Sequence, residues 1–271
     1  MPPTPRFLSP SGYSLVKAKQ HVRSIIRALR GTYPNARTSL DHAGPWELLI
    51  ATIMSAQSTD ETVNRVTPVL FERYPTPGAL ASANHEDVER IIYPSGFFRQ
   101  KTKSIIATST DIVEKFGGEV PRTIEGLTSL RGVARKTANV VMANCWPRPE
   151  SKHGIFVDTH IRRVSQRLGW TPNEDPVKIE QDLMELLPRT AWVDVPHQLI
   201  MLGRGPCDAQ RPDHASCPLL KWCPTGKAAL AAGPPEPKTR RAGGAKPRVR
   251  ARTTPAKRTG GGTSTVRPRS T

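Results

Sequence analysis

The stretch that decides the fold is Leu127–Cys145, which reads LTSLRGVARKTANVVMANC. It predicts a short helix that ends near Leu130, a tight turn at Gly132, and a second helix that begins around Ala134. In the second helix the apolar residues recur at helical spacing and form one stripe, which consists of Ala138, Val141, Met142 and Cys145. We therefore expect a helical hairpin.

Lys136 and Asn139 are expected to lie off this stripe, near the start of the second helix. The free backbone N–H groups of a helix that follows a glycine turn can bind a phosphate without any base-specific contact. On the local pattern alone, Lys136 is a phosphate contact, a solvated surface charge or a nucleophile, and the pattern does not decide among them.

Most of the remaining chain shows the same helical spacing. Apolar residues recur at intervals of three and four, for example from Leu15 to Leu29 and from Ile179 to Leu187, whereas the alternation typical of strands is scarce. Proline and glycine turn signals separate segments of helical length. We expect about ten short helices and an all-α fold class.

The composition indicates a polyanionic partner. The 271 residues carry a formal net charge of +17 and the pI is about 10.3, so nucleic acid or an anionic membrane surface is the expected partner. No apolar run approaches the ~20 residues of a membrane-spanning helix, and the N-terminal stretch lacks the apolar segment of a secretory signal. We expect a cytoplasmic, nucleoid-associated location.

Both ends of the chain are expected to be unstructured, with a flexible N-terminus at residues 1–12. The C-terminal tail, residues 226–271, contains 12 Lys or Arg against a single acid, Glu236. Because the tail has few large apolar residues, we predict that it is disordered. It either adds salt-sensitive contacts to a phosphate backbone or serves only as a solubilising linker.

The hairpin sequence LRGVARKTANVV resembles the endonuclease III family of helix-hairpin-helix DNA glycosylases, where it reads LPGVGRKTANVV. The similarity extends from about Leu15 to Cys223, and it includes MSAQSTD at Met54–Asp60, EVP at Glu119–Pro121 and VDTHIRRV at Val157–Val164. The resemblance implies a two-lobed fold. A six-helix barrel lobe would span 39–155, with the hairpin at 121–145, and a discontinuous metal-cluster lobe would comprise 13–38 and 156–225.

The resemblance also implies that Lys136 is a Schiff-base nucleophile and that Asp158 is the carboxylate facing it. An amine attacks the sugar C1′ only when it is unprotonated, and the neighbouring Arg135 is expected to favour loss of that proton. A carboxylate stabilises the positive charge that develops as the base departs. Asp158 precedes an apolar-periodic helix, so it is also a predicted helix N-cap, and the two roles are compatible.

Flipping a base out of duplex DNA leaves a gap that must be filled. By resemblance, Gln57 occupies the plug position and Phe97 the wedge position, although the adjacent pair Phe97 and Phe98 is equally consistent with core packing. The remaining expected DNA contacts lie in the hairpin and in the VDTH segment, and they are Arg131, Gly132, Ala134, Arg135, Thr137 and His160.

Three of the four cysteines, Cys207, Cys217 and Cys223, fall within seventeen residues, which indicates metal binding in a cytosolic chain. The family binds a [4Fe-4S] cluster with the spacing C-x6-C-x2-C-x5-C, and here the second position is His214. A Cys3His set suits an iron–sulfur cluster with an unusual ligand. It also suits zinc, and a lost metal site is the third alternative. Cys145 is expected to be core.

Two hairpin residues depart from the family pattern, because Arg131 replaces a proline and Ala134 replaces a glycine. A positive φ at Ala134 would cost about 1 kcal/mol, whereas Arg131 offers an added phosphate contact. The resemblance implies a bifunctional glycosylase and abasic-site lyase that removes oxidised pyrimidines from double-stranded DNA and nicks by β-elimination. Because this fold needs no partner to complete its core, we expect a monomer. The alternative is a DNA-binding protein that recognises damaged or abasic sites with weak or no catalysis.

Overall fold

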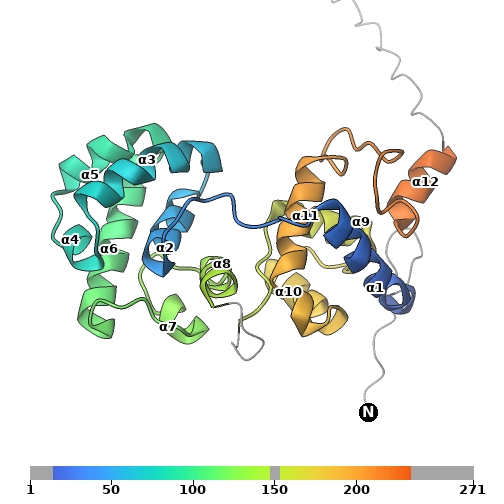
Figure 1. The fold of residues 1–271 in the computed structure, drawn as a ribbon, viewed down its shortest axis with the longest axis horizontal. Coiled ribbons are helices and arrows are strands. Elements are labelled where there is room, and N and C mark those ends of the chain that lie inside the picture. Colours follow the sequence, from blue (N-terminus) through green and yellow to red (C-terminus); the bar gives the residue numbers. More distant parts are fainter. Residues whose placement is uncertain (1–14, 147–152, 233–271) are drawn as a thin grey trace, which may run out of the picture. The chain divides into compact units, whose positions relative to one another are not determined.

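The computed structural model describes residues 15–146 and 153–232, and every regular element in these ranges is a helix (Figure 1). The all-α prediction is confirmed, with somewhat more helices than the ten or so expected. The α-helices are α1 (Leu15–Thr32), α2 (Pro45–Met54), α3 (Asp60–Arg73), α4 (Pro77–Ala81), α5 (His85–Ile92), α6 (Phe98–Phe116), α7 (Ile124–Thr128), α8 (Arg135–Cys145), α9 (Thr159–Arg167), α10 (Pro176–Leu186), α11 (Asp194–Arg204) and α12 (Pro224–Ala232), with 3-10 turns η1 (Tyr93–Ser95) and η2 (Arg189–Ala191).

Local signals in the sequence set many of the helix ends. Thr59 caps α3 by accepting the Thr62 N–H at 3.2 Å, and Asp175 caps α10 by accepting the Lys178 N–H at 3.0 Å. A proline occupies the first turn of α2, α4 and α10, where its missing N–H costs nothing. The helix α6 ends at Gly117, whose φ of 62° is a left-handed conformation that favours glycine.

The buried apolar side chains form two clusters, and α8 contributes to both of them. The α2–α8 core includes Leu48, Ile105, Leu127, Ala138, Val141 and Met142. The α1/α9–α11 core includes Ile25, Ile161, Leu183, Leu199, Val140 and Ala143. Because α8 packs on two sides, residues 138–143 are all buried, and the prediction that Asn139 lies off the buried line is wrong. The helix that carries Lys136 is thereby fixed by both cores.

The described residues belong to one compact unit, and the lobe boundaries expected from the resemblance stay a prediction. The expected disorder from residue 226 is wrong for residues 226–232, because they form most of α12. This alanine-rich segment follows Pro224, a favoured first residue of a helix. Residues 1–12 and 233–271 lie outside the described parts. Within the described parts, no helix combines the length and apolarity that crossing a membrane requires.

Candidate active site

The hairpin turn between α7 and α8 is anchored to α6. Thr108 donates its hydroxyl to the Arg131 carbonyl at 2.6 Å, and the buried Asp111 carboxylate accepts the Arg131 N–H at 2.6 Å. Gly132 has a φ of 86°, and a Cβ at this position would lie 3.3 Å from the Ser104 side chain. The predicted sequence of helix, turn and helix is therefore present, with a tight turn that requires its glycine.

The N-terminus of α8 has no side-chain cap. Its first intrahelical hydrogen bond joins the Ala138 N–H to the carbonyl of Ala134, the N-cap residue. The N–H groups of Arg135, Lys136 and Thr137 precede this bond and have no partner within the helix, which is the arrangement that suits a phosphate. Ala134 has a φ of −84°, so its methyl group causes no backbone strain.

The Arg131 side chain has a partner that the sequence did not predict. Its Nε lies 3.1 Å from both oxygens of Asp111, and Lys115 Nζ lies 3.0 Å from the same carboxylate. Burial by itself raises the pKa of Asp111, but the hydrogen bonds from Arg131 and Lys115 outweigh it and lower the pKa to about 2. The guanidinium Nε is therefore engaged with Asp111, but the side chain is 58% exposed, and its expected phosphate contact stays a prediction.

A buried hydrogen-bond network joins α8 to α10 and to the segment before Asp158. Glu180 accepts two hydrogen bonds from Arg135 at 2.8 and 3.0 Å and one from Asn139 Nδ2 at 2.9 Å. Asn139 Oδ1 accepts the Gly154 N–H at 2.9 Å. We call these four residues the Glu180 network. The Arg135 guanidinium therefore pairs with Glu180. The sequence had instead suggested that this charge acts on the neighbouring Lys136.

Replacing Gly154 with Ala is expected to break the Glu180 network. The added Cβ would overlap Glu180 Oε1, so the buried carboxylate must move away from its donors. We expect a loss of about 2–4 kcal/mol in the free energy of unfolding. Urea denaturation would measure the loss.

The matched control is Gly31→Ala in α1, where a new Cβ meets nothing within 4 Å. This change is expected to be neutral or slightly stabilising. Equal unfolding free energies for Gly154→Ala and the unmodified protein would contradict the packing described for Glu180.

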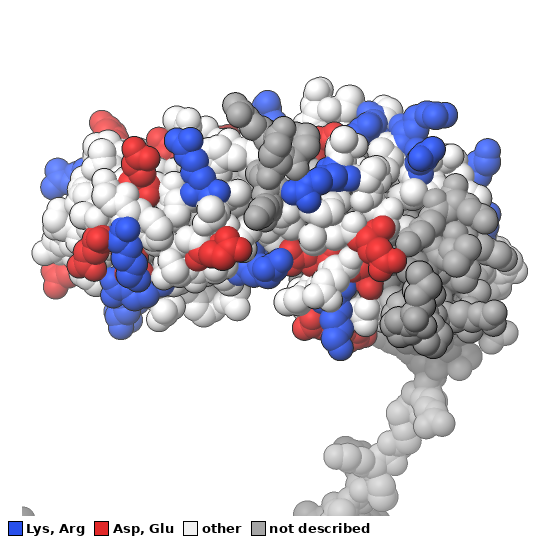
Figure 2. Space-filling model, turned by 90° about the horizontal axis from the view of Figure 1, so that it is seen from below, with Lys and Arg blue, Asp and Glu red and all other residues white. Residues whose placement is uncertain are grey.

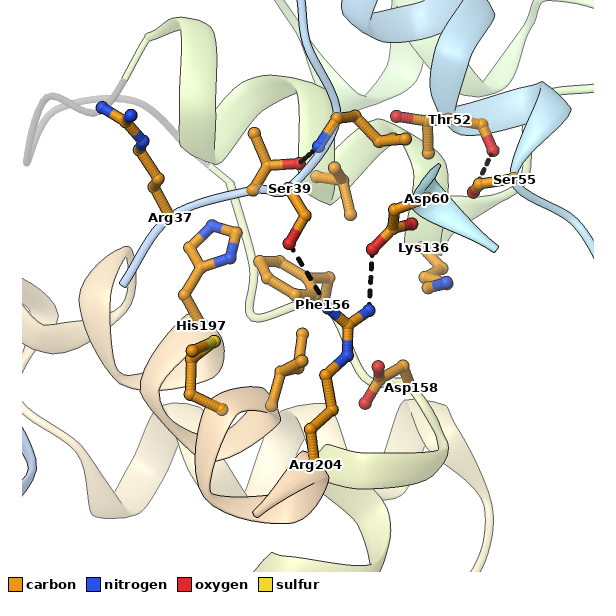
Figure 3. Close-up of a pocket in the computed structure, with 15 residues that line it drawn as sticks. Arg37, Ser39, Thr52, Ser55, Asp60, Lys136, Phe156, Asp158, His197 and Arg204 are labelled. Atoms are coloured by element: carbon orange, nitrogen blue, oxygen red, sulfur yellow. Dashed lines mark hydrogen bonds and ion pairs between the residues drawn. The ribbon is translucent and has the colours of Figure 1, made fainter. Parts of the chain in front are cut away.

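Lys136 and Asp158 line the same pocket (Figure 3). Lys136 is exposed, and within the described structure its Nζ has no hydrogen bond or ion pair. Asp158 is the N-cap of α9, because its Oδ1 accepts the Ile161 N–H at 2.7 Å. The helix-cap prediction is therefore confirmed. The cap uses one carboxylate oxygen, so the other remains available to a substrate in the pocket.

Other walls of this pocket come from α11 and from the segments before α2 and α3, and no sequence pattern predicted them. Arg204 lies 2.7 Å from Asp60 and 3.3 Å from Ser39, so an ion pair and a hydrogen bond cross the pocket (Figure 3). His197 packs against Phe156 with ring centroids 5.1 Å apart. Burial lowers the pKa of His197 to about 4, so its ring is neutral at physiological pH.

Gln57 and Phe97 share an uncommon backbone conformation. They are the two non-glycine residues with positive φ in the described ranges, at 55° and 48°. Such conformations cost on the order of 1–3 kcal/mol and concentrate at functional sites. Phe97 is 68% exposed, whereas Phe98 packs against the α2–α8 core. Core packing therefore describes Phe98 but not Phe97, and neither Gln57 nor Phe97 lines the Lys136 pocket.

His160 was expected to contact DNA, and the structure places it against Arg163. Its Nδ1 lies 3.2 Å from Arg163 Nη2, and the residue does not line the Lys136 pocket. Thr137 is half-buried at the third position of α8. The structure therefore brings Lys136 and Asp158 to one pocket, and it places His160 elsewhere on α9.

The four expected metal ligands all lie in the loop between α11 and α12. The Gly226 N–H lies 3.3 Å from Cys223 Sγ, and an Arg167 nitrogen lies 3.3 Å from Cys207 Sγ. A Cβ on Gly226 would lie 3.3 Å from His214 Nδ1 and 3.6 Å from Cys223 Sγ, so the glycine leaves space between these two donors.

Chemically, three thiols and one imidazole fit either an iron–sulfur cluster or zinc. However, no group of three His, Cys, Asp or Glu side chains converges as a metal site within the described ranges. The fourth cysteine, Cys145, packs against the α2–α8 core, where burial raises the pKa of its thiol to about 11. Its predicted core position is confirmed.

The charge of the folded part is mixed over the face seen in Figure 2, where Lys and Arg alternate with Asp and Glu. Of the 40 Lys and Arg in the chain, 12 belong to residues 226–271. Much of the cationic excess therefore lies in the tail and not on this face.

Residues 50–189 match the family described as HhH-GPD superfamily base excision DNA repair protein. Curated relatives named endonuclease III come from Synechocystis sp. (46% identity, 79% of this chain and 96% of the relative) and Bacillus subtilis (43% identity, 72% and 88%). A solved non-covalent endonuclease III–DNA complex is 40% identical with a TM-score of 0.72, covering 79% of this chain and 98% of its own. The chain belongs to the endonuclease III family.

Proposed function

We propose that this chain is a bifunctional DNA glycosylase and abasic-site lyase of base excision repair that removes oxidised pyrimidines from double-stranded DNA. The observation that carries the proposal is the shared pocket of Lys136 and Asp158, with an unpaired lysine at the uncapped start of the hairpin helix. A related solved structure supports it: a trapped endonuclease III–DNA covalent intermediate is 40% identical, with a TM-score of 0.72, and covers 78% of this chain and 98% of its own.

In the proposed reaction, the unprotonated Lys136 amine attacks C1′ and the damaged base leaves with the bonding electron pair and a proton. Asp158 stabilises the positive charge that develops on the sugar. The C1′–O4′ bond then breaks, O4′ takes up a proton from solvent, and an iminium forms between Lys136 and C1′. Transfer of a C2′ proton to water expels the 3′ phosphate, which nicks the strand, and hydrolysis of the iminium releases the lysine.

The proposed DNA contacts divide into backbone binding and gap filling. The free N–H groups at the start of α8, which follow Gly132 and Ala134, bind a phosphate. Gln57 and Phe97 fill the gap left by the flipped nucleotide. The basic tail, residues 226–271, adds salt-sensitive affinity. In this proposal the protein acts as a monomer in the cytoplasm, associated with the nucleoid.

The test is covalent trapping on a duplex that contains one abasic site, in the presence of sodium borohydride. We expect a stable protein–DNA adduct with this duplex and none with an undamaged duplex of the same sequence. Specific binding to the abasic duplex without an adduct would instead establish the alternative, a damage-binding protein without catalysis.

We propose in addition that Cys207, His214, Cys217 and Cys223 hold a [4Fe-4S] cluster. Such a cluster would stabilise the conformation of the loop before α12 and would take no part in the reaction at C1′. Three thiols with the family spacing intact support this assignment over a site that has been lost.

Metal analysis tests the cluster. We expect anaerobically purified protein to contain iron and acid-labile sulfide, His214→Cys to retain at least as much iron, and His214→Ala to lose most of it with a lower Tm. Elemental analysis and calorimetry measure both effects. Zinc without iron, or no metal at all, would overturn the assignment.

A further inference from the structure

Lys101 is a buried lysine that the proposed reaction does not use. It lies in the first turn of α6 and is 5% exposed, although a lysine is rarely buried without an acidic partner. Its Nζ donates to the Ser95 carbonyl at 2.7 Å and to Ser58 Oγ. Burial lowers the pKa of Lys101, because the charged form is poorly solvated there. A buried ammonium group loses hydration, so a structural role for its two hydrogen bonds is expected.

The two oxygens that Lys101 binds belong to two separate segments. Ser58 lies in the connection between α2 and α3, directly after Gln57. Ser95 ends η1 and lies two residues before Phe97. The Ser58 hydroxyl also donates to the Ser95 carbonyl, so the three groups form a closed triangle. The lysine therefore ties the Gln57 segment to the Phe97 segment.

Both tied segments carry the left-handed backbone described above. The φ values of Gln57 and Phe97 are 55° and 48°. Gly96, between Ser95 and Phe97, also has a positive φ, of 67°. Strained backbone persists only where surrounding contacts hold it. The bonds from Lys101 act within one or two residues of each strained position, so they are well placed to hold both.

We propose that Lys101 is a positioning residue that fixes the Gln57 and Phe97 segments relative to each other, so that both side chains enter the gap in a damaged duplex together. The inference rests on the proposed function and deepens it. Lys101 itself touches no substrate. It matters only where a base stack must be opened, and a single-stranded abasic site needs no such opening.

The experiment compares borohydride trapping rates of Lys101→Met on duplex and on single-stranded abasic DNA. We expect the duplex rate to fall about tenfold or more, because small misplacements of positioning groups have effects of this order. The single-strand rate should stay within about twofold. The matched control is Lys103→Met, which removes an exposed lysine from the same helix and should change neither rate.

Folding is controlled in two ways. Lys101→Met keeps the direct bond from Ser58 to the Ser95 carbonyl, and circular dichroism and Tm report whether the helices form. If Lys101→Met does not fold, Ser58→Ala removes one corner of the triangle and should produce a smaller loss on duplex DNA alone.

A duplex containing 2-aminopurine opposite the abasic site gives a second readout. We expect weaker fluorescence change on binding of Lys101→Met than of the unmodified protein, because the gap is filled less well. Equal losses on duplex and single strand, or no loss on either, would overturn the role of Lys101. A failure of the unmodified protein to trap either DNA would overturn the proposed function itself, and the role of Lys101 with it.

Discussion

Lys136→Ala is expected to abolish the borohydride-trapped adduct and to reduce strand nicking by about 10³-fold or more, the scale seen when a covalent nucleophile is removed. Among the described residues that line the pocket, Lys136 is the one primary amine, because the other basic side chains are the guanidinium groups of Arg37 and Arg204 and the neutral imidazole of His197. A guanidinium does not form a Schiff base under these conditions. No neighbouring group can therefore replace it.

The fold of this variant should be unaffected. Lys136 is exposed, so its truncation is expected to change the free energy of unfolding by no more than about 0.5 kcal/mol. Affinity for an abasic duplex should fall modestly, because the N–H groups of α8 remain. Lys178→Ala, an exposed lysine of α10, is the control and should trap normally. An adduct of normal yield with Lys136→Ala would show that Lys136 is not the nucleophile.

Asp158→Asn is expected to slow base removal by about 10²–10⁴-fold while leaving the fold intact. Asparagine caps a helix as well as aspartate does, so the bond to the Ile161 N–H survives. The negative charge that would stabilise the departing-base transition state is lost. Single-turnover kinetics on a duplex with one oxidised pyrimidine measure the effect.

Asp158→Ala separates the two roles of this carboxylate. It should lose the same activity and, in addition, about 1 kcal/mol of stability from the missing cap. If Asp158→Asn kept full activity and only Asp158→Ala were impaired through its stability, Asp158 would be a helix cap and nothing more.

Much of the fold could be predicted because its signals are local. Helical spacing, Gly132 and the cap at Asp158 each act within a few residues, and each was found where expected. The N-terminal limit of the tail was misplaced, because low apolar content suggested disorder in a segment whose alanines favour a helix after Pro224.

The parts of the site that could not be predicted depend on partners far apart in the chain. Glu180 is 45 residues from Arg135, and no periodic pattern connects them. The same holds for the Arg131 and Asp111 pair, because the partner of the hairpin arginine lies 20 residues away in the chain. Burial of Asn139 followed from packing on two sides of α8, which a single amphipathic stripe cannot encode.

Because α8 packs against both cores, substitutions in either core are expected to affect the helix that carries Lys136. A core residue remote from the pocket, such as Leu127 or Leu183, supports the same helix that carries Lys136. Loosening either core is therefore expected to disturb the position of Lys136 as well as to lower the free energy of unfolding. Variants far from the pocket would then combine lower stability with a displaced nucleophile.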